Sequence, residues 1–243
     1  IATSTRFLVV DLPMGEGTKI KNIEKAERFA MDFIELGKRI GIKVECVVTY
    51  GDKPIGRAVG PALEAKEALC TLEGEGPSSL IEKSTGLAGV LLEAGGVAAR
   101  GEGKKKALEI LKSDAALKKM KEIIAAQGGN PKITSDDIKL GRYRSEIRSD
   151  EDGYVVGINN KAVVDIARAA GAPRDKRAGF LLLKSKGYKV SAGDVLFEIY
   201  AESKYKLDQA MKLARQQNPV KIEGMLIERI PRYTVIESSR GEQ

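Results

Sequence analysis

Two glycine-containing loops in this sequence have the residue types that suit a small charged ligand. The first loop, residues 13–18, contains Gly15 and Gly17 and follows the apolar run at residues 6–12. Two glycines let a backbone approach a phosphate or a metal ion, and Asp11 stands at a strand end, where α/β sheets present ligands. The third glycine of a dinucleotide-binding loop is missing, so a tight turn that binds nothing is the alternative.

The second loop, residues 53–60 with the sequence KPIGRAVG, combines two glycines with the cations Lys53 and Arg57. Carbonyl oxygens of such a loop, with the carboxylate of Glu67 about two helical turns further on, can hold a monovalent cation. A solvated acid on a helix surface explains Glu67 equally well, and the spacing alone does not decide between the two.

A third pattern, G-x-x-V-x-x-G-D-x-L at residues 187–196, is typical of the hairpin in flattened β-barrels that carry lipoyl or biotinyl groups. Such a carrier presents a lysine at a tight hairpin tip, usually beside methionine. Lys184 and Lys186 are nearby but lack that setting. A carrier domain, which would gain covalent mass at a lysine, is therefore kept as an alternative.

Composition excludes several classes of chemistry. The 243 residues include no histidine, which rules out Ser–His–Asp and Cys–His catalysis and His-based metal sites within this chain. Lys+Arg is 41 and Asp+Glu is 34, giving a net charge of +7, but the charges are interleaved, which favours a salt-bridged surface over nucleic-acid binding.

Cys46 and Cys70 are expected to be free thiols of a reducing cytoplasm, with one disulfide bridge between them as the alternative. No membrane span or signal peptide is indicated, so we expect no membrane partner.

Hydrophobic periodicity divides the chain into an α/β part and an α+β part. The first part opens with a strand at residues 6–12, a helix from Ile23 to Gly41 capped by Asn22, and a parallel strand at residues 43–49. Further helices are predicted at residues 61–72, 77–92 and 103–126. The second part is predicted to contain strands at 153–158, 179–184 and 195–200, a hairpin at 187–194, and helices at 160–170 and 204–217. The boundaries are placed at 1–130 for the first part, 131–151 for a linker and 152–243 for the second part.

Together these features resemble the nucleoside phosphorylase family that contains thymidine and pyrimidine-nucleoside phosphorylases. The matching stretches, in family order, are residues 8–17, 53–60, 62–64, 66–68, 126–129, 152–155 and 187–196. The block PIGRAVGPALEAKEAL at residues 54–69 is the most specific, and the second half looks closest to the AMP phosphorylase branch. The resemblance implies the C-terminal half of the family's central α/β domain, followed by its α+β C-terminal domain with a barrel-sandwich-like hairpin core.

The resemblance also implies a pentosyltransferase reaction of nucleotide metabolism. Phosphate, as co-substrate, attacks C1′ of a nucleoside or nucleoside 5′-monophosphate, releasing the base and forming a (deoxy)ribose 1-phosphate derivative. The family's phosphate-binding and base-gripping residues precede the strand at residues 6–12, so no catalytic residue is expected here and the chain alone is expected to be inactive. The expected partners are these substrates, a separate N-terminal half if the enzyme is split, and further copies in a homo-oligomer. The alternative is a non-catalytic assembly module that uses the apolar tail at residues 220–230.

The resemblance assigns roles to particular positions of this sequence. Asp11, Gly15 and Gly17 map to the loop beside the base, and Lys19 stands where the family often has Phe, which favours a charged or larger substrate than a pyrimidine nucleoside. Lys53 and Arg57 map to the rim of the active site, near a 5′-phosphate. The backbone carbonyls of Ile55 and Ala58 and the carboxylate of Glu67 map to part of a potassium site, whose other ligands would precede this chain.

Overall fold

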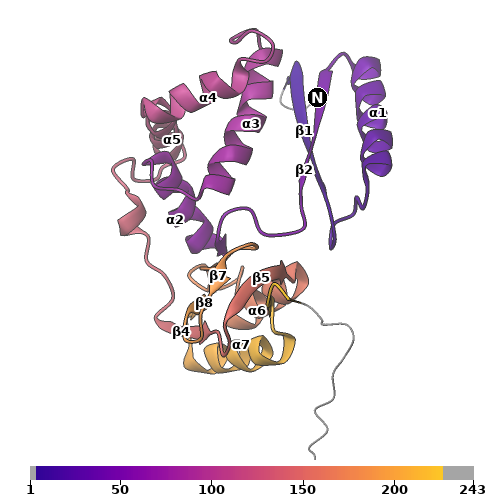
Figure 1. Cartoon of the computed structure of the whole chain (residues 1–243). Helices are drawn as coiled ribbons and strands as arrows, with labels where there is room; N and C mark the ends of the chain where they lie inside the picture. Colours follow the sequence, from indigo (N-terminus) through magenta and orange to yellow (C-terminus); the bar gives the residue numbers. More distant parts are fainter. Residues whose placement is uncertain (1–3, 227–243) are drawn as a thin grey trace, which may run out of the picture.

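The computed structural model describes residues 4–226, and its first part opens with a β-α-β unit (Figure 1). Strands β1 (Phe7–Met14) and β2 (Lys43–Tyr50) run parallel, with helix α1 (Ile23–Ile40) between them in the chain. The Asn22 side chain caps α1 and Gly41 ends it with a φ of 74°, as the sequence predicts. Strand β1 continues through Met14, so the turn begins at Gly15 and not at residue 13 as expected.

A layer of helices follows this unit on the side of the sheet away from α1 (Figure 1). It contains helices α2 (Pro61–Leu72), α3 (Ser78–Ala94), α4 (Gly103–Lys112) and α5 (Ala115–Ala126). The short strand β3 (Ala58–Val59), which the sequence analysis missed, precedes these helices and joins a sheet of the second part. The single helix predicted over residues 103–126 is wrong, because Asp114 has a φ of 58° and separates α4 from α5. Aspartate tolerates this left-handed conformation, and Ser113 and Asp114 are weak helix formers.

Residues 131–151, which the sequence indicates as a linker, contain regular structure. A 3-10 turn at Ser135–Asp137 is followed by strand β4 (Tyr143–Arg148), which pairs antiparallel with β8 (Val195–Ala201) of the second part. The sequence YRSEIR of β4 carries alternating charges and lacks the apolar run by which the other strands were predicted. The division of the chain at residues 130 and 152 stays a prediction.

The second part adds β5 (Gly153–Ile158), α6 (Asn160–Ala170), β6 (Gly179–Leu182), β7 (Lys189–Val190), α7 (Lys204–Gln217) and β9 (Val220–Glu223). Among the described residues, these strands combine with β3, β4 and β8 to form two sheets, with the strand orders β3-β6-β8-β4 and β7-β5-β9. The predicted hairpin at residues 187–194 is wrong in its pairing, because β7 pairs with β5 while β8 lies in the other sheet. These two sheets close no barrel in the described part of the chain, so the barrel-sandwich core is not confirmed.

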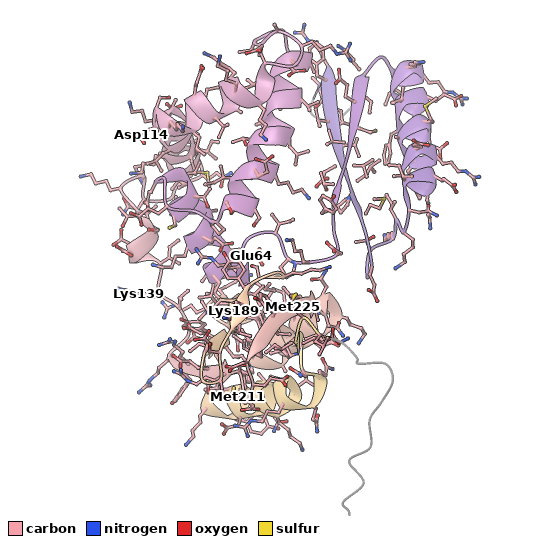
Figure 2. All side chains as sticks on the ribbon, viewed as in Figure 1. Glu64, Asp114, Lys139, Lys189, Met211 and Met225 are labelled. Carbon is pink, nitrogen blue, oxygen red and sulfur yellow. The ribbon has the colours of Figure 1, made fainter. Side chains whose placement is uncertain are left out.

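The hydrophobic core lies mainly in the second part. Phe180 and Phe197 are fully buried and stack with ring centroids 4.5 Å apart. Buried residues of α6 and α7 belong to the same core: Val163, Ile166, Ala167, Ala170, Leu207, Ala210 and Ala214. Figure 2 shows this dense packing of side chains in the lower part of the molecule, with Met211 of α7 against it. In the first part, the buried cluster between α1 and the sheet is much smaller, with Leu12, Ile20 and Ala26 as its buried members among the described residues.

Three further expectations concern the thiols, the apolar tail and membrane spans. Cys46 and Cys70 are free and partly buried, as predicted, and burial raises the pKa of both thiols. The apolar tail predicted at residues 220–230 begins as β9, and its last residues lie outside the described part of the chain. Within residues 4–226, no helix combines the length and apolar character needed to cross a membrane.

The stacked phenylalanines should dominate the stability of the second part. Phe197→Ala removes one buried ring, and we expect it to lower the free energy of unfolding by about 3–5 kcal/mol, measured by urea denaturation. Tyr205→Ala is the control, because Tyr205 on α7 is 72% exposed and its loss should change stability by less than about 0.5 kcal/mol. Equal effects of the two substitutions would contradict this placement of the core.

Candidate functional site

The turn between β1 and α1 is held closed by its own hydrogen bonds. The Gly15 amide donates to the Ile20 carbonyl at 3.0 Å, and the Thr18 hydroxyl donates to the carbonyls of Gly15 and Ile20 at 2.8 and 2.6 Å. Gly15 has a φ of 147°, and a Cβ there would lie 2.9 Å from the backbone nitrogen of Asp52. Glycine is therefore required at this position by the close approach of the loop after β2, whether or not a ligand binds.

Asp11, predicted at the base-side loop, is held by two side chains that the sequence analysis missed. Its carboxylate accepts a hydrogen bond from the Thr49 hydroxyl at 2.6 Å and pairs with the Lys83 ammonium at 2.7 Å. Thr49 was predictable, because the carboxyl ends of parallel strands meet at one edge of a sheet. Lys83 was not, because no pattern in the sequence directs α3 onto this edge. The ion pair is partly buried, with the Lys83 side chain 18% exposed.

The second loop is organised around Glu67 of α2. Its carboxylate accepts hydrogen bonds from the amide of Arg57 at 3.0 and 3.1 Å and from the amide of Ala58 at 3.3 Å. Gly56 has a φ of 73°, and a side chain there would collide with this carboxylate. The Arg57 guanidinium lies 3.9 Å from the same acid, while the Gly56 amide donates to the Ser79 hydroxyl at 3.4 Å. The loop is therefore fastened to both α2 and α3.

The second loop carries Ile55 and Ala58 and is bound to Glu67, the three residues that the resemblance assigns to a potassium site, but the surroundings of Glu67 fit such an ion poorly. The Glu67 carboxylate already accepts amide hydrogens and lies beside the Arg57 guanidinium, which opposes a second cation. The carbonyls of Ile55 and Ala58 add two oxygens, whereas hard cations take six or more oxygen ligands in proteins. Within residues 4–226, no group of three or more acids, cysteines or histidines is placed to hold a metal ion.

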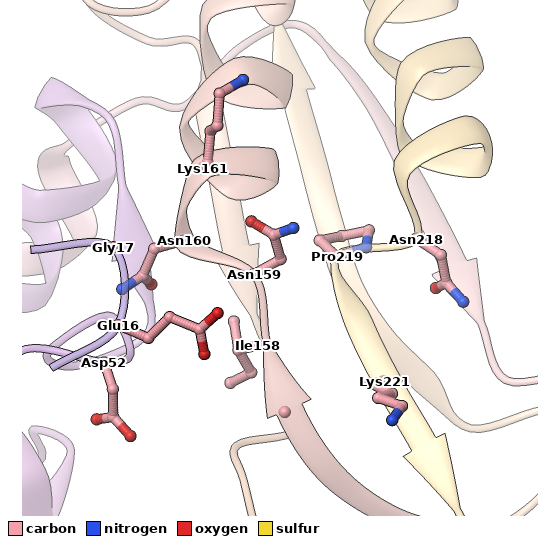
Figure 3. Close-up of a pocket in the computed structure, with 11 residues that line it drawn as sticks. Glu16, Gly17, Asp52, Ile158, Asn159, Asn160, Lys161, Asn218, Pro219 and Lys221 are labelled. Atoms are coloured by element: carbon pink, nitrogen blue, oxygen red, sulfur yellow. The ribbon is translucent and has the colours of Figure 1, made fainter.

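A cleft of about 490 Å³ lies between the first loop and the second part (Figure 3). Glu16, Gly17 and Asp52 line one side, and the other side comes from residues 157–161 together with Asn218, Pro219 and Lys221. Figure 3 shows the Glu16 carboxylate directed toward Ile158 and Asn159, just before α6, and the Lys161 side chain pointing away from Glu16. The side-chain amide of Asn160 donates to the Gly51 carbonyl at 3.2 Å, and the Lys186 ammonium lies 3.9 Å from the Asp52 carboxylate, so the two sides are in contact.

The predicted site residues therefore form two groups in the structure. Asp11, Gly15, Gly17 and Lys19 lie on β1 and the turn after it, with Lys19 exposed. Ile55, Arg57, Ala58 and Glu67 gather at the second loop. Lys53 is partly buried in the segment that joins β2 to that loop. The segment at residues 51–53 connects the groups, since the Gly51 amide donates to the Met14 carbonyl at 2.8 Å.

A separate polar cluster lies on β4 and β8 of the second part. The carboxylate of Glu198, a buried residue, accepts hydrogen bonds from the Arg144 guanidinium and the Tyr200 hydroxyl. Burial would raise the pKa of Glu198, but these hydrogen bonds outweigh it and leave the pKa below its ordinary value. Burial and the bond to Glu198 raise the pKa of Tyr200 to about 12. The cluster satisfies its own charges and is structural.

Removing Lys83 should expose its role at Asp11. Lys83→Met leaves a partly buried carboxylate without its cation, and we expect the free energy of unfolding to fall by about 1–3 kcal/mol in urea denaturation. Lys104→Met is the matched control, because Lys104 pairs with Glu82 at the surface, where such pairs contribute less than about 1 kcal/mol. A smaller effect at Lys83 than at Lys104 would contradict the proposed anchoring of Asp11.

The Tyr200 hydroxyl should stay protonated at high pH. Its raised pKa means that its contribution to stability is complete below about pH 10 and is lost as the pH rises through about 12. The stability difference between the native chain and Tyr200→Phe should therefore shrink over that interval. An NMR titration of the ring carbon, assigned by its absence in Tyr200→Phe, gives the pKa directly, and a midpoint near 10 would refute the buried hydrogen bond.

Comparison with known proteins gives consistent matches. Residues 154–221 match the pyrimidine nucleoside phosphorylase C-terminal domain. The AMP phosphorylase of Methanosarcina mazei is 53% identical over 225 residues, which are 92% of this chain and 44% of that protein. The AMP phosphorylase of Thermococcus kodakarensis is 54% identical over 230 residues, covering 94% of this chain and 46% of that protein. The chain thus spans slightly less than half the length of these curated relatives. It corresponds to the C-terminal part of a protein of the thymidine and pyrimidine-nucleoside phosphorylase family, in the branch of the AMP phosphorylases.

Proposed function

We propose that this chain is part of an enzyme that phosphorolyses nucleoside 5′-monophosphates, with AMP as the preferred substrate. It supplies the base-side loop and the C-terminal domain and is inactive without the remainder of the enzyme. The observation that carries the proposal is the identity of 53% and 54% to proteins named AMP phosphorylase, over more than nine-tenths of this chain.

The proposed reaction exchanges one bond at the sugar. The bond between C1′ and the base nitrogen breaks, and an oxygen of inorganic phosphate forms a new bond to C1′. The departing base keeps the electron pair and gains a proton, while the sugar develops positive charge in the transition state. Catalysis therefore requires cations and hydrogen-bond donors that hold phosphate close to C1′, and a group that stabilises the leaving base.

In this proposal the first loop contacts the nucleotide base and the second loop lies at the rim. Asp11, Gly15 and Gly17 shape the base-side turn, with Lys19 exposed beside it and available to a polar or charged substrate. Lys53 and Arg57 lie on the segment that leads to the rim, where a 5′-phosphate would meet them. A potassium site, if the enzyme has one, needs ligands beyond Ile55, Ala58 and Glu67.

The proposal extends to the setting of the enzyme. Cys46 and Cys70 are free thiols, which is the usual state of cysteine in a reducing cytoplasm. We expect the proposed enzyme, with this chain and the remaining part together in each subunit, to form a homo-oligomer. The competing function, a non-catalytic assembly module, is supported by the apolar surface of α1, where Phe29 and Leu36 are 40% and 54% exposed.

A reconstitution assay tests the proposal. The chain is mixed with the segment of the T. kodakarensis AMP phosphorylase that precedes the matched region, and base release is measured with AMP, CMP, UMP, thymidine and uridine, with and without phosphate. We expect phosphate-dependent release, fastest from AMP, in the mixture and none from either part alone. Activity of the chain alone would refute its incompleteness, and association without activity would favour the assembly module.

The same mixture tests the role of Lys19. Lys19→Ala should lower kcat/KM for AMP by about tenfold or more, because a hydrogen bond to a charged group contributes about 1.5–3 kcal/mol. Lys21→Ala, an exposed lysine two positions along the same turn, is the control and should leave kcat/KM unchanged. Equal losses in the two variants would argue against a specific contact by Lys19.

A further inference from the structure

The parallel strands of the first part are less buried than their sequences require. Strands β1 and β2 read FLVVDLPM and KVECVVTY, and both lie wholly within the described residues. Such near-continuous apolar runs are typical of parallel strands that are covered on both faces. Leu12 is nevertheless the single buried residue in the two strands, whereas most residues of β6 and β8 are buried. The first part therefore lacks cover that the second part supplies for itself.

Helix α1 shows the same deficit on one of its faces. Small residues bring it close to the sheet: Ala26 is buried, and a side chain at Gly37 would collide with that of Val44. Its large apolar residues lie beside this contact and remain exposed, namely Phe29 at 40%, Phe33 at 38%, Leu36 at 54% and Ile40 at 43%. We refer to these four residues as the α1 stripe.

The α1 stripe has the geometry of a helix-packing surface. Its members are spaced i, i+4, i+7 and i+11, which keeps them within about 60° of one another at about 100° per residue. By the same count, the stripe is centred about 70° from the direction of Ala26, Ala30 and Gly37, which face the sheet. The apolar arc of α1 is thus wider than the area that this chain covers, and its uncovered part is continuous with the existing contact.

The sheet of this β-α-β unit is also narrow. In the described part of the chain, β1 and β2 form a sheet of two strands, so each has one edge without a strand partner. Unpaired edges of apolar strands bind further strands readily. The unpaired edges and the α1 stripe belong to the same β-α-β unit, in which α1 and α3 lie on opposite sides of the sheet (Figure 1).

We infer that the α1 stripe is the docking surface for the part of the enzyme that this chain does not span. This inference rests on the proposed function and adds the surface through which the two parts join. The chain matches 44% and 46% of the length of its relatives, so more than half of such an enzyme must be accommodated. The occupant is accordingly an α/β segment that extends the sheet and packs its own apolar side chains on the stripe.

The test uses the full chain and the preceding segment of the T. kodakarensis AMP phosphorylase as the probe. Association is measured by analytical ultracentrifugation, and hydrogen exchange reports protection of residues 23–40. The double variant Phe29→Ser with Leu36→Ser should weaken association by about tenfold or more, because two large apolar contacts are lost. Met31→Ser is the matched control, because Met31 is 67% exposed and lies on another side of α1, and it should leave association unchanged.

Each result bears on the inference. Added protection of α1 that the double variant abolishes supports it, provided that circular dichroism shows both variants folded; Leu36→Lys serves as a second disruption. Absence of association, or association that the double variant does not weaken, overturns it. A dimer of the chain alone that depends on the stripe overturns the proposed occupant in favour of a second copy. Stripe-dependent association without phosphorolysis leaves the surface standing and refutes the proposed function.

Discussion

The carboxylate of Glu67 fixes the point at which the two parts of the chain meet. It accepts hydrogen bonds from the amides of Arg57 and Ala58, and so sets the backbone that forms β3 on the edge of β6. The Leu182 amide completes the junction by donating to the Arg57 carbonyl at 2.8 Å. Leaving such amides unsatisfied costs about 1–3 kcal/mol, so the path of the second loop, the start of α2 and the shared sheet all depend on this acid.

The burial of apolar surface differs sharply between the two parts. The second part, with β3 added at the edge of β6, encloses Phe180 and Phe197 between its sheets and the helices α6 and α7. The first part has the sequence of a buried parallel sheet, and within residues 4–226 its two strands pack mainly against α1 and α3. Parallel sheets occur with both faces covered. The incomplete burial of β1 and β2 therefore agrees with a chain that spans less than half the length of its relatives.

Much of this architecture could be predicted from residue patterns, and the failures have identifiable causes. Helix α1 was predictable from its period and its caps, Asn22 and Gly41, because these signals are local. Strand β4 was missed because its apolar residues alternate with charges, and β7 was assigned to the wrong partner because pairing is a long-range property. The roles predicted for the loop residues stay predictions, whereas the contact of Lys83 with Asp11 was missed because packing of α3 against β1 has no local signal.

The pairing of charges around the two loops limits what this chain can do with phosphate. Lys83 is paired with Asp11, Arg57 with Glu67, and Lys186 with Asp52, so much of the positive charge near the loops is already neutralised. A phosphate nucleophile needs cations that face it without such competition, because a neighbouring carboxylate repels the anion. In the proposed enzyme, this geometry therefore suits recognition of the nucleotide better than activation of the attacking phosphate.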